Sequence, residues 1–420
     1  MQPPRLASNR FTVAVFTALL LTPVGFTAPA SGQSAGEGPV QGRNLVAPAG
    51  HQLDLPFSPA METGDFLYLS GALGNKPGTV EVKAGDIAAQ SRQMFDNLEA
   101  VLAAGGSSMS RVVDADVFVS DARFIDGVMA VYSKRLPEPR PAGLVVEADI
   151  AIPGALAEVA MVAARPGVEI LPVNPADWPK LGVSSHGVLA GDTLFLSAMM
   201  GYGPDTLGDP GQQIRRALQN MGVVLDNAGM DYSNVVSCRV FLADARSFKA
   251  LNDIYPSFFP SPPPARATMR AALASPELEA VIKCIAVAGE RRAVLPEGAK
   301  PRATLSPAIA TEDRLFLSGM VGRDANGKFP PDVSEQTRLV LGHLKATLEA
   351  DGLGWEDVVS ANVYLTDIRH YALMNAVYAE TVGTPAPARA TVGTQLMSPD
   401  ALVEIQMLAT RTAPAKSGSE

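Results

Sequence analysis

Apolar and polar residues follow one another along this chain with two different periods, and the order of those periods repeats. In the clearest copy, residues 314–319 form a short apolar run that enters a glycine, which predicts a strand and a turn. Residues 333–351 then carry Leu341, Leu344 and Leu348 at the spacing of one helix face. This stretch predicts an amphipathic helix.

The second half of the same copy returns to strands. Residues 357–366 (DVVSANVYLT) are rich in strand-forming residues, 369–381 have the pattern of a second helix, and 388–396 and 401–410 predict two more strands. Strands interspersed with two helices predict an α+β fold, in which a two-layer domain has both helices on one face of a mixed sheet. The other face must then pack against something, and another copy is the simplest partner.

The repeat has a fixed period of 123 residues. Three matching segments end at tyrosines with this spacing, namely Tyr132, Tyr255 and Tyr378. The same spacing separates three glutamines, Gln90, Gln213 and Gln336. A unit of this length has the size of a domain rather than of a solenoid repeat.

The period predicts three similar domains, at 52–166, 176–290 and 300–411. The two joins between them are rich in Pro, Gly and charged residues, which is typical of linkers. Residues 412–420 have the composition of a disordered tail.

The first 30 residues have the pattern of a secretory signal peptide. Arg5 and Arg10 precede an apolar stretch at 11–26, and Ala28-Pro29-Ala30 forms a small-x-small cleavage pattern. The alternative is a membrane anchor, but Pro23 interrupts a run that is short for a span. We therefore expect a periplasmic or secreted protein with a flexible leader at 31–51.

Composition excludes several classes of function. The chain has 420 residues, of which 47% are hydrophobic and 18% charged, and its formal net charge is −9 without any basic run. This argues against nucleic acid or an anionic membrane surface as the main partner. Four His and two Cys argue against a His/Cys metal site. Cys238 and Cys284 lie on predicted strands, either as buried thiols or as a disulfide.

A set of short motifs in the third copy resembles the RidA/YjgF family of enamine/imine deaminases, also labelled L-PSP endoribonucleases. The motifs, which recur in their order across all three copies, are Ser318-Gly319, Gln336-Thr337-Arg338, Asn375-Ala376-Val377-Tyr378, Pro387-Ala388-Arg389 and Val403-Glu404-Ile405. Members of that family form homotrimers with clefts between subunits. The resemblance therefore implies a chorismate-mutase-like fold whose three domains pack as an intramolecular pseudo-trimer in a monomeric chain.

The resemblance also implies a chemistry. The family hydrolyses 2-imino acids, formed from enamines, to 2-oxo acids and ammonia without a metal or an organic cofactor. By position, Arg389 would bind the substrate carboxylate, Glu404 would act as the acid/base group, and the Gly319 amide would be a backbone donor. Asn375 belongs to the expected substrate-binding set. The spacing of Arg389 and Glu404 predicts that they lie on successive strands and share a face.

The three copies differ at these positions. Steps of 123 residues from Arg389 lead to Arg266 and Gly143, and the same steps from Glu404 lead to Val281 and Glu158. Only the third copy then has both groups, so the sequence predicts one complete site, mainly in domain 3. Arg266 is expected to bind an anion.

One departure affects every copy. The family's cleft tyrosine corresponds here to Phe57, Ser184 and Leu305. An alternative function is therefore a catalytically degenerate scaffold that binds a small carboxylate metabolite. The negative net charge and the lack of a run of basic residues argue against an endoribonuclease. In either main reading the partner is a small carboxylate-bearing molecule, with no nucleic acid and no membrane.

Overall fold

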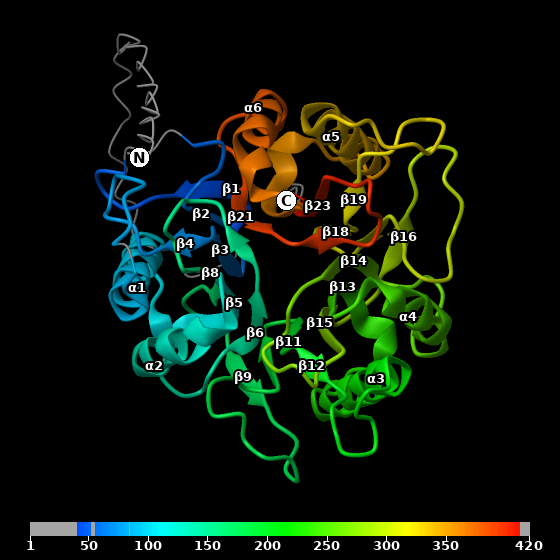
Figure 1. The fold of residues 1–420 in the computed structure, drawn as a ribbon, viewed down its shortest axis with the longest axis horizontal. Helices are drawn as coiled ribbons and strands as arrows, with labels where there is room; N and C mark the ends of the chain where they lie inside the picture. Colours follow the sequence, from blue (N-terminus) through cyan, green and yellow to red (C-terminus); the bar gives the residue numbers. More distant parts are fainter. Residues whose placement is uncertain (1–39, 52–54, 84, 412–420) are drawn as a thin grey trace, which may run out of the picture. The chain divides into compact units, whose positions relative to one another are not determined.

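The structure is a computed structural model, and it describes residues 40–51, 55–83 and 85–411. The predicted signal peptide and the tail at 412–420 lie outside the described residues. Three mixed sheets follow one another along the chain (Figure 1). Within the described ranges, no helix is long and apolar enough to cross a membrane.

The strands fall into three sets, one for each domain. Domain 1 contains β1 Val40–Val46, β2 Ala60–Gly64, β3 Phe66–Leu69, β4 Ala72–Leu73, β5 Val112–Val119, β6 Ala142–Glu147, β7 Asp149–Ile150 and β8 Ala157–Ala164. Domain 2 contains β9 Ile170–Val173, β10 Gly187–Ala190, β11 Thr193–Leu196, β12 Met199–Met200, β13 Val235–Leu242, β14 Ala265–Arg270 and β15 Ala280–Val287. Domain 3 contains β16 Arg292–Val294, β17 Ala308–Ala310, β18 Arg314–Leu317, β19 Met320–Val321, β20 Val358–Leu365, β21 Ala388–Gly393, β22 Gln395–Leu396 and β23 Val403–Thr410.

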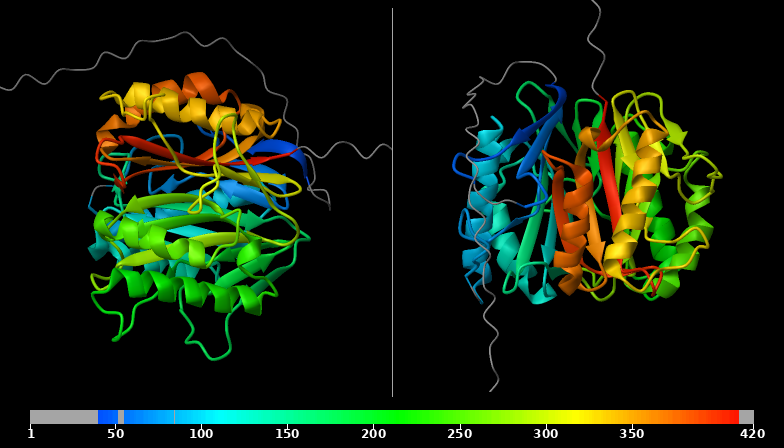
Figure 2. Two further views of the ribbon diagram at one scale, coloured as in Figure 1. Left: turned by 90° about the vertical axis from the view of Figure 1, so that its right-hand side faces the viewer. Right: turned by 90° about the horizontal axis from the view of Figure 1, so that it is seen from above.

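Two helices accompany each sheet. They are α1 Ile87–Ala104 and α2 Ile125–Arg135 in domain 1, α3 Pro210–Asn227 and α4 Phe248–Ile254 in domain 2, and α5 Val333–Glu349 and α6 Tyr371–Val382 in domain 3. Figures 1 and 2 show α5 and α6 side by side on one face of the sheet that contains β18 and β23. The predicted α+β architecture, with both helices on one face, is thus confirmed.

The helix at 333–351 forms as the sequence predicts, ending at Glu349. Its start is fixed by Asp332, whose side chain accepts a hydrogen bond from the Glu335 amide at 2.9 Å. The apolar face, which includes Leu341, Leu344 and Leu348, is buried against the sheet.

The repeated glutamine ties each long helix to the last hairpin of its domain. Gln336 is fully buried, and its Nε2 donates to Pro330 O at 2.7 Å and to Asp400 O at 2.9 Å. Its Oε1 accepts from the Leu402 amide at 2.8 Å. A buried amide with both ends satisfied explains why glutamine stands at this position in every copy.

The joins between domains contain more regular structure than the sequence predicts. Val40–Val46, inside the predicted flexible leader, forms β1 and pairs with β2. Ile170–Val173 and Arg292–Val294, inside the predicted linkers, form β9 and β16 and pair with β10 and β17. The cause is the apolar residue that each segment buries, because Val46, Val173 and Val294 join the domain cores.

Short strands cross from each domain to a neighbour. β22 of domain 3 pairs with β14 of domain 2, and β7 of domain 1 pairs with β21 of domain 3. Val146 at the end of β6 forms a bridge with Leu273 of domain 2. The sheet faces away from the helices also contribute residues of all three domains to two further apolar clusters. The pseudo-trimeric packing itself stays a prediction.

A buried group of charges joins domains 1 and 2. Lys283 Nζ lies 2.6 Å from Asp114 Oδ1 and 2.5 Å from Asp116 Oδ1, and Arg239 Nη1 lies 2.5 Å from Asp116 Oδ2. Positions 116, 239 and 362 are equivalent in the repeat, yet they hold Asp, Arg and Asn. Domains 1 and 2 therefore meet here through complementary rather than identical side chains.

Candidate functional site

Arg389 lies on β21 with its guanidinium among aromatic rings. Its Cζ is 4.7 Å from the ring centre of Tyr378, 4.9 Å from that of Phe57 and 5.7 Å from that of Tyr371. The side chain is buried, and its Nε and Nη1 have no hydrogen-bond partner among the described residues. A buried guanidinium with two nitrogens free is prepared to bind an anion such as a carboxylate.

Glu158 of β8, in domain 1, is the acidic residue that faces Arg389. Its Oε1 accepts a hydrogen bond from the Thr391 amide at 3.3 Å, and its side chain is buried. Burial raises the pKa of Glu158 to about 8, although the Thr391 amide and Arg389 both act in the opposite direction. At neutral pH this carboxyl is therefore largely protonated and able to give a proton.

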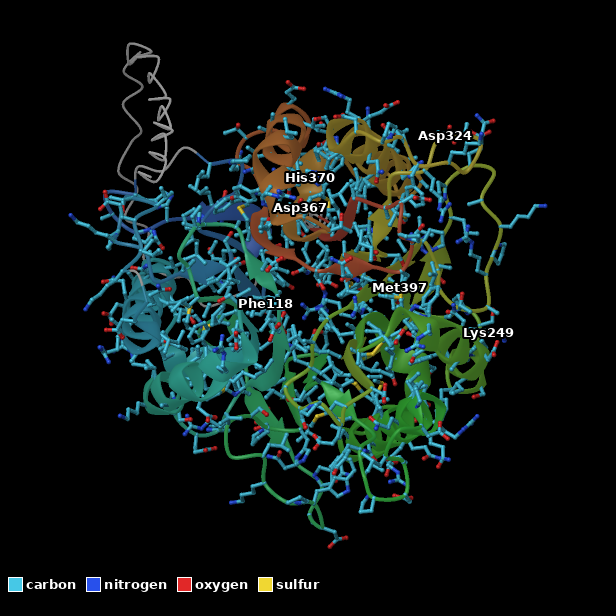
Figure 3. The ribbon with its side chains drawn as sticks, in the orientation of Figure 1. Phe118, Lys249, Asp324, Asp367, His370 and Met397 are labelled. Carbon is cyan, nitrogen blue, oxygen red and sulfur yellow. A yellow bond between two sulfur atoms is a disulfide. The ribbon has the colours of Figure 1, made fainter. Side chains whose placement is uncertain are left out.

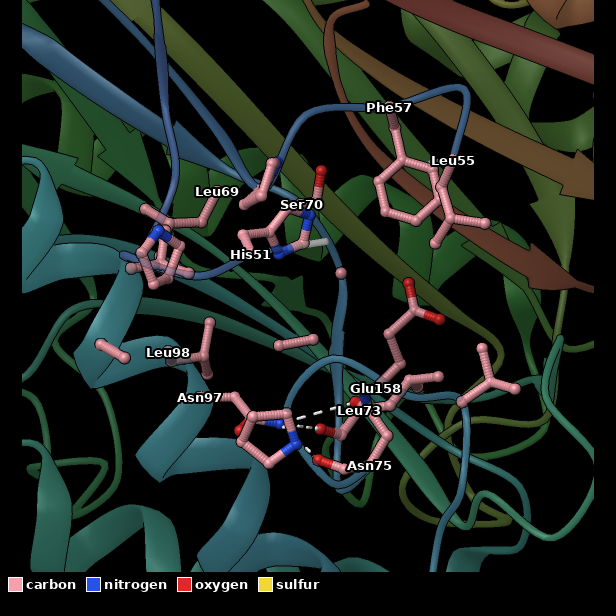
Figure 4. A pocket seen from close by; sticks show the side chains of 18 of the residues that line it. His51, Leu55, Phe57, Leu69, Ser70, Leu73, Asn75, Asn97, Leu98 and Glu158 are labelled. Atoms are coloured by element: carbon pink, nitrogen blue, oxygen red, sulfur yellow. Dashed lines mark hydrogen bonds between the residues drawn. The ribbon is translucent and has the colours of Figure 1, made fainter. Parts of the chain in front are cut away.

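Arg389 and Glu158 line one cavity of about 520 Å³, which we call the first cleft. Figure 4 shows Glu158 below Phe57 and Leu55 and beside Leu73, with Asn97 on the opposite side. Asn97 Nδ2 donates to Leu73 O and Asn75 O, both at 2.9 Å, and so holds this wall in place. The wall is mainly apolar.

A second pair, Arg266 and Glu404, has the same kind of arrangement, and we use the name second cleft for this pair by analogy with the first. Arg266 of β14, in domain 2, lies with its Cζ 4.8 Å from the ring centre of Tyr255, and its Nη2 donates to Asn252 Oδ1 at 2.7 Å. Its Nε and Nη1 are again buried without a partner in the described chain. Burial raises the pKa of Glu404, on β23 of domain 3, to about 7, against the effects of the Thr268 amide and Arg266.

Glycine is required beside each glutamate. A Cβ at Gly71 would overlap Glu158 Oε1, and a Cβ at Gly319 would overlap Glu404 Oε1. The Gly319 amide, expected as a free donor, instead donates to Arg266 O at 3.2 Å. The structure thus gives Gly319 a different role from the predicted one, which is to make room for the carboxyl group in the second cleft.

The third equivalent position has the same backbone hydrogen bond as the others but lacks the arginine and the glutamate. The Gly143 amide donates to Ser197 Oγ at 2.8 Å, as the Arg389 amide does to Ser70 Oγ at 2.7 Å. However, Gly143 replaces the arginine and Val281 the glutamate, and Ala198 stands where the other clefts need glycine. A Cβ is tolerated at Ala198 because no carboxyl group has to fit beside it.

The prediction that Arg389 and Glu404 share a face is wrong. Arg389 is opposite Ala361 of β20, and Glu404 is opposite Tyr364 of the same strand. Ala361 and Tyr364 are three residues apart, and an odd separation in a strand puts side chains on opposite faces. Domain 3 therefore contributes Arg389 to one cleft and Glu404 to another, and neither cleft lies within a single domain.

Asn375 is not among the partners of Arg389. Its Oδ1 is buried without a hydrogen-bond partner in the described chain, whereas its counterpart Asn252 binds Arg266. The residues that sequence reasoning did not include are Glu158, Asn252 and the tyrosines under each arginine. Combining the arginine of one copy with the glutamate of another would have identified Glu158. Copy 1 has this glutamate but has Gly143 in place of the arginine.

Cys238 and Cys284 are joined by a disulfide and are direct partners on β13 and β15. Cys238 is also the register partner of Arg266 on β14. Within the described residues, no group of three or more His, Cys, Asp or Glu side chains is placed to hold a metal ion.

Comparisons with known proteins agree with the repeat. The family model described as Endoribonuclease L-PSP matches residues 50–165, 180–288 and 297–411. A RutC family protein of Pyrococcus horikoshii is 40% identical over 112 residues, which are 26% of this chain and 89% of that protein. The chloroplastic Reactive Intermediate Deaminase A of Arabidopsis thaliana is 38% identical over 110 residues, which are 25% of this chain and 59% of that protein.

Solved structures match one domain at a time. A member of the YjgF protein family from Neisseria meningitidis is 32% identical and covers 30% of this chain and 98% of its own, with a TM-score of 0.26. A protein of the conserved Rid family from Yersinia pestis is 28% identical and covers 29% of this chain and 100% of its own, with a TM-score of 0.28.

Proposed function

Since this chain belongs to the Endoribonuclease L-PSP family, we propose that its two clefts hydrolyse 2-imino acids to 2-oxo acids and ammonia. The name of the Arabidopsis relative, a reactive intermediate deaminase, supports this reading. The observation that carries it is the pairing, in each cleft, of a buried arginine that has free nitrogens with a glutamate whose pKa is raised to about 7 or 8.

The chemistry needs only groups that the clefts contain. The guanidinium of Arg389 or Arg266 binds the substrate carboxylate, which holds the C=N carbon beside the glutamate. The protonated Glu158 or Glu404 gives its proton to the imine nitrogen while water adds to the carbon, and the carboxylate then takes a proton from that water. The glutamate, protonated again by that water, gives this proton to the nitrogen of the amino alcohol, and ammonia leaves. The carboxylate then takes the hydroxyl proton, and the water oxygen remains as the carbonyl oxygen.

The second candidate function is binding without turnover. Phe57 stands where the family's tyrosine is expected, and it stacks over Arg389 without offering a hydroxyl group. A cleft that only holds a small carboxylate would need the arginine and the cavity but no proton transfer. Ribonuclease activity has weaker support, because the net charge of −9 opposes binding of a polyanion.

An assay of imine hydrolysis tests this proposal. Imino acids are generated in situ by an amino-acid oxidase, and their hydrolysis is followed with the wild-type protein, Arg389→Ala, Arg266→Ala and the double variant. Arg123→Ala, which changes an exposed arginine paired with Asp121, is the matched control. We expect acceleration by the wild type and its loss in the double variant only. No acceleration over a panel of amino acids would favour the binding scaffold.

Export is part of the same proposal. The charged, apolar and small-residue order of residues 1–30 supports a cleaved signal peptide, and the Cys238–Cys284 disulfide is typical of proteins in oxidising compartments. We propose a periplasmic or secreted location. Fractionation of cells, together with N-terminal sequencing of the exported form, tests it.

A further inference from the structure

The aromatic rings around Arg389 differ in what they present to the first cleft. Phe57 and Tyr371 both line the cavity, whereas Tyr378 is fully buried and is not part of the cavity wall. The side chain of Phe57 has no polar atom. Among the described residues that line this cavity, Tyr371 is therefore the one aromatic residue with a hydroxyl group.

Helix α6 places this hydroxyl group against Arg389. Tyr371 is the first residue of α6, and Asn375 and Tyr378 follow at the spacing of one helix face. The centre of the Tyr371 ring lies 5.7 Å from Arg389 Cζ, and Arg389 Nη2 donates to Tyr371 Oη at 3.4 Å. The hydroxyl oxygen is the acceptor in this contact, so its own proton remains available for another partner.

No carboxylate of the described residues accepts the hydroxyl proton of Tyr371. Glu158 lines the same cavity, and its Oε1 accepts from a backbone amide of β21 at 3.3 Å. Asp367, which lies near His370 at the start of α6 (Figure 3), accepts from the Arg369 amide and Arg369 Nε, both at 2.9 Å. A donor beside the two unpaired arginine nitrogens is therefore left for a ligand of the cavity.

The second copy shows the same place without the hydroxyl group. Phe248 stands 123 residues before Tyr371, and the centre of its ring also lies 5.7 Å from the Cζ of its arginine, Arg266. Arg266 Nη2 donates instead to Asn252 Oδ1, at 2.7 Å. Phenylalanine thus packs beside the guanidinium as tyrosine does, and packing does not require the hydroxyl group of Tyr371.

We propose that Tyr371 is a substrate-binding residue of the first cleft, whose hydroxyl group donates a hydrogen bond to the carboxylate that Arg389 holds. The ligand carboxylate then has two kinds of donor, the guanidinium through Nε and Nη1 and the phenol through its proton. Phe248 offers no such donor beside Arg266. The inference rests on the proposed function for the reacting imine, but the contact with the carboxylate can be tested by binding alone.

Binding of a stable 2-oxo acid product is the first test. Calorimetry with 4-methyl-2-oxopentanoate is carried out on Arg266→Ala, in which the first cleft alone keeps its arginine, with and without Tyr371→Phe. We expect Tyr371→Phe to weaken binding about 10-fold, because a hydrogen bond to a charged group is lost. The matched control is Tyr202→Phe, which removes the hydroxyl group of an exposed tyrosine and should leave the affinity unchanged. Equal affinities with and without Tyr371→Phe would overturn the inference, as would a first cleft that binds no 2-oxo acid.

A second variant separates direct contact from an effect through Arg389. Arg389→Lys keeps the positive charge but removes the guanidinium that binds the hydroxyl group. Tyr371→Phe should weaken binding in Arg389→Lys as well. An effect that disappears there would show that Tyr371 only holds Arg389 in place, and the inference would be wrong.

Kinetics of imine hydrolysis give an independent readout. Because the carboxylate keeps its charge during the reaction, Tyr371→Phe should raise KM about 10-fold and change kcat by less than about 3-fold. A fall in kcat at unchanged KM would contradict a role in carboxylate binding. If Tyr371→Phe weakens 2-oxo acid binding but the wild type hydrolyses no imine, the proposed function fails and the carboxylate contact stands.

Discussion

Arg389 and Glu404 belong to one sheet, yet they lie on its opposite faces and are near residues of two different domains. Arg389 faces Glu158 of domain 1, and Glu404 faces Arg266 of domain 2. The chain therefore has two candidate clefts where its sequence, considered one copy at a time, predicts a single one. Each cleft depends on two domains remaining in contact.

The two clefts should have different pH profiles. Arg266→Ala leaves the first cleft, where Glu158 has a pKa of about 8, and Arg389→Ala leaves the second, where Glu404 has a pKa of about 7. Since the protonated carboxyl is the proton donor, turnover should decline above about pH 8 in the first variant and about one unit lower in the second. Superimposable profiles of kcat against pH would contradict this assignment.

The same glutamates should make the protein less stable as the pH rises. Both pKa values are above the ordinary value of 4.5, so between about pH 4.5 and 8 the folded protein retains protons that the unfolded chain releases. Stability therefore falls with rising pH through this window. Glu158→Gln/Glu404→Gln should gain Tm relative to the wild type between pH 5 and pH 9, as measured by calorimetry. A constant difference across that range would refute the raised pKa values.

A methyl group beside either glutamate should strongly reduce the activity of the cleft that contains that glutamate. Gly319→Ala places a Cβ against Glu404 Oε1, and Gly71→Ala does the same to Glu158. We expect each variant to lose about 10-fold or more of the activity of its own cleft, because the carboxyl group is displaced from its position near the arginine. The matched control is Ala198→Gly at the third position. Full activity of Gly319→Ala in a protein that also carries Arg389→Ala, which leaves the second cleft alone, would count against this role.

The disulfide should contribute to stability. Cys238 and Cys284 are 46 residues apart, and closing a loop of this length restricts the unfolded chain by about 4 kcal/mol in the chain-entropy description. Cys238→Ala/Cys284→Ala and chemical reduction should both lower Tm. Because Cys238 is the neighbour of Arg266, we also expect a larger effect on the second cleft than on the first. Unchanged Tm on reduction would show that the bond does not form in solution.

Removal of one partner from the buried charges between domains 1 and 2 should destabilise the folded protein. Lys283→Ala leaves Asp114 and Asp116 with Arg239 as their remaining counter-ion, and loss of one member of such a group costs about 3–5 kcal/mol. Denaturant unfolding measures this loss.

The mature protein should be a monomer. A mass of about 41 kDa is expected after removal of 30 residues, and light scattering measures it. A stable homotrimer would refute the pseudo-trimer.

The sequence predicts the fold and each reactive residue better than it predicts how those residues combine. The helix at 333–351 and the fixed period follow from local patterns, because an amphipathic face is visible within one segment. The pairing of Arg389 with Glu158 does not, because it depends on strand register and on contacts between residues more than 200 positions apart. The predicted shared face failed for the same reason, because the register partners of Arg389 and Glu404 on β20 are three residues apart.

The unlike residues at positions 116, 239 and 362 have a consequence for how such a protein can change. In an assembly of three identical subunits, one mutation alters every copy of a cleft at once, and a residue on the shared axis meets only itself. In a single chain, Asp116 can pair with Arg239. A substitution in one copy of the repeat can also change one cleft while the equivalent residues of the other copies stay the same. Gly143 and Val281 stand where the other copies have arginine and glutamate, and Arg266 and Arg389 belong to two candidate sites that substitutions can change independently.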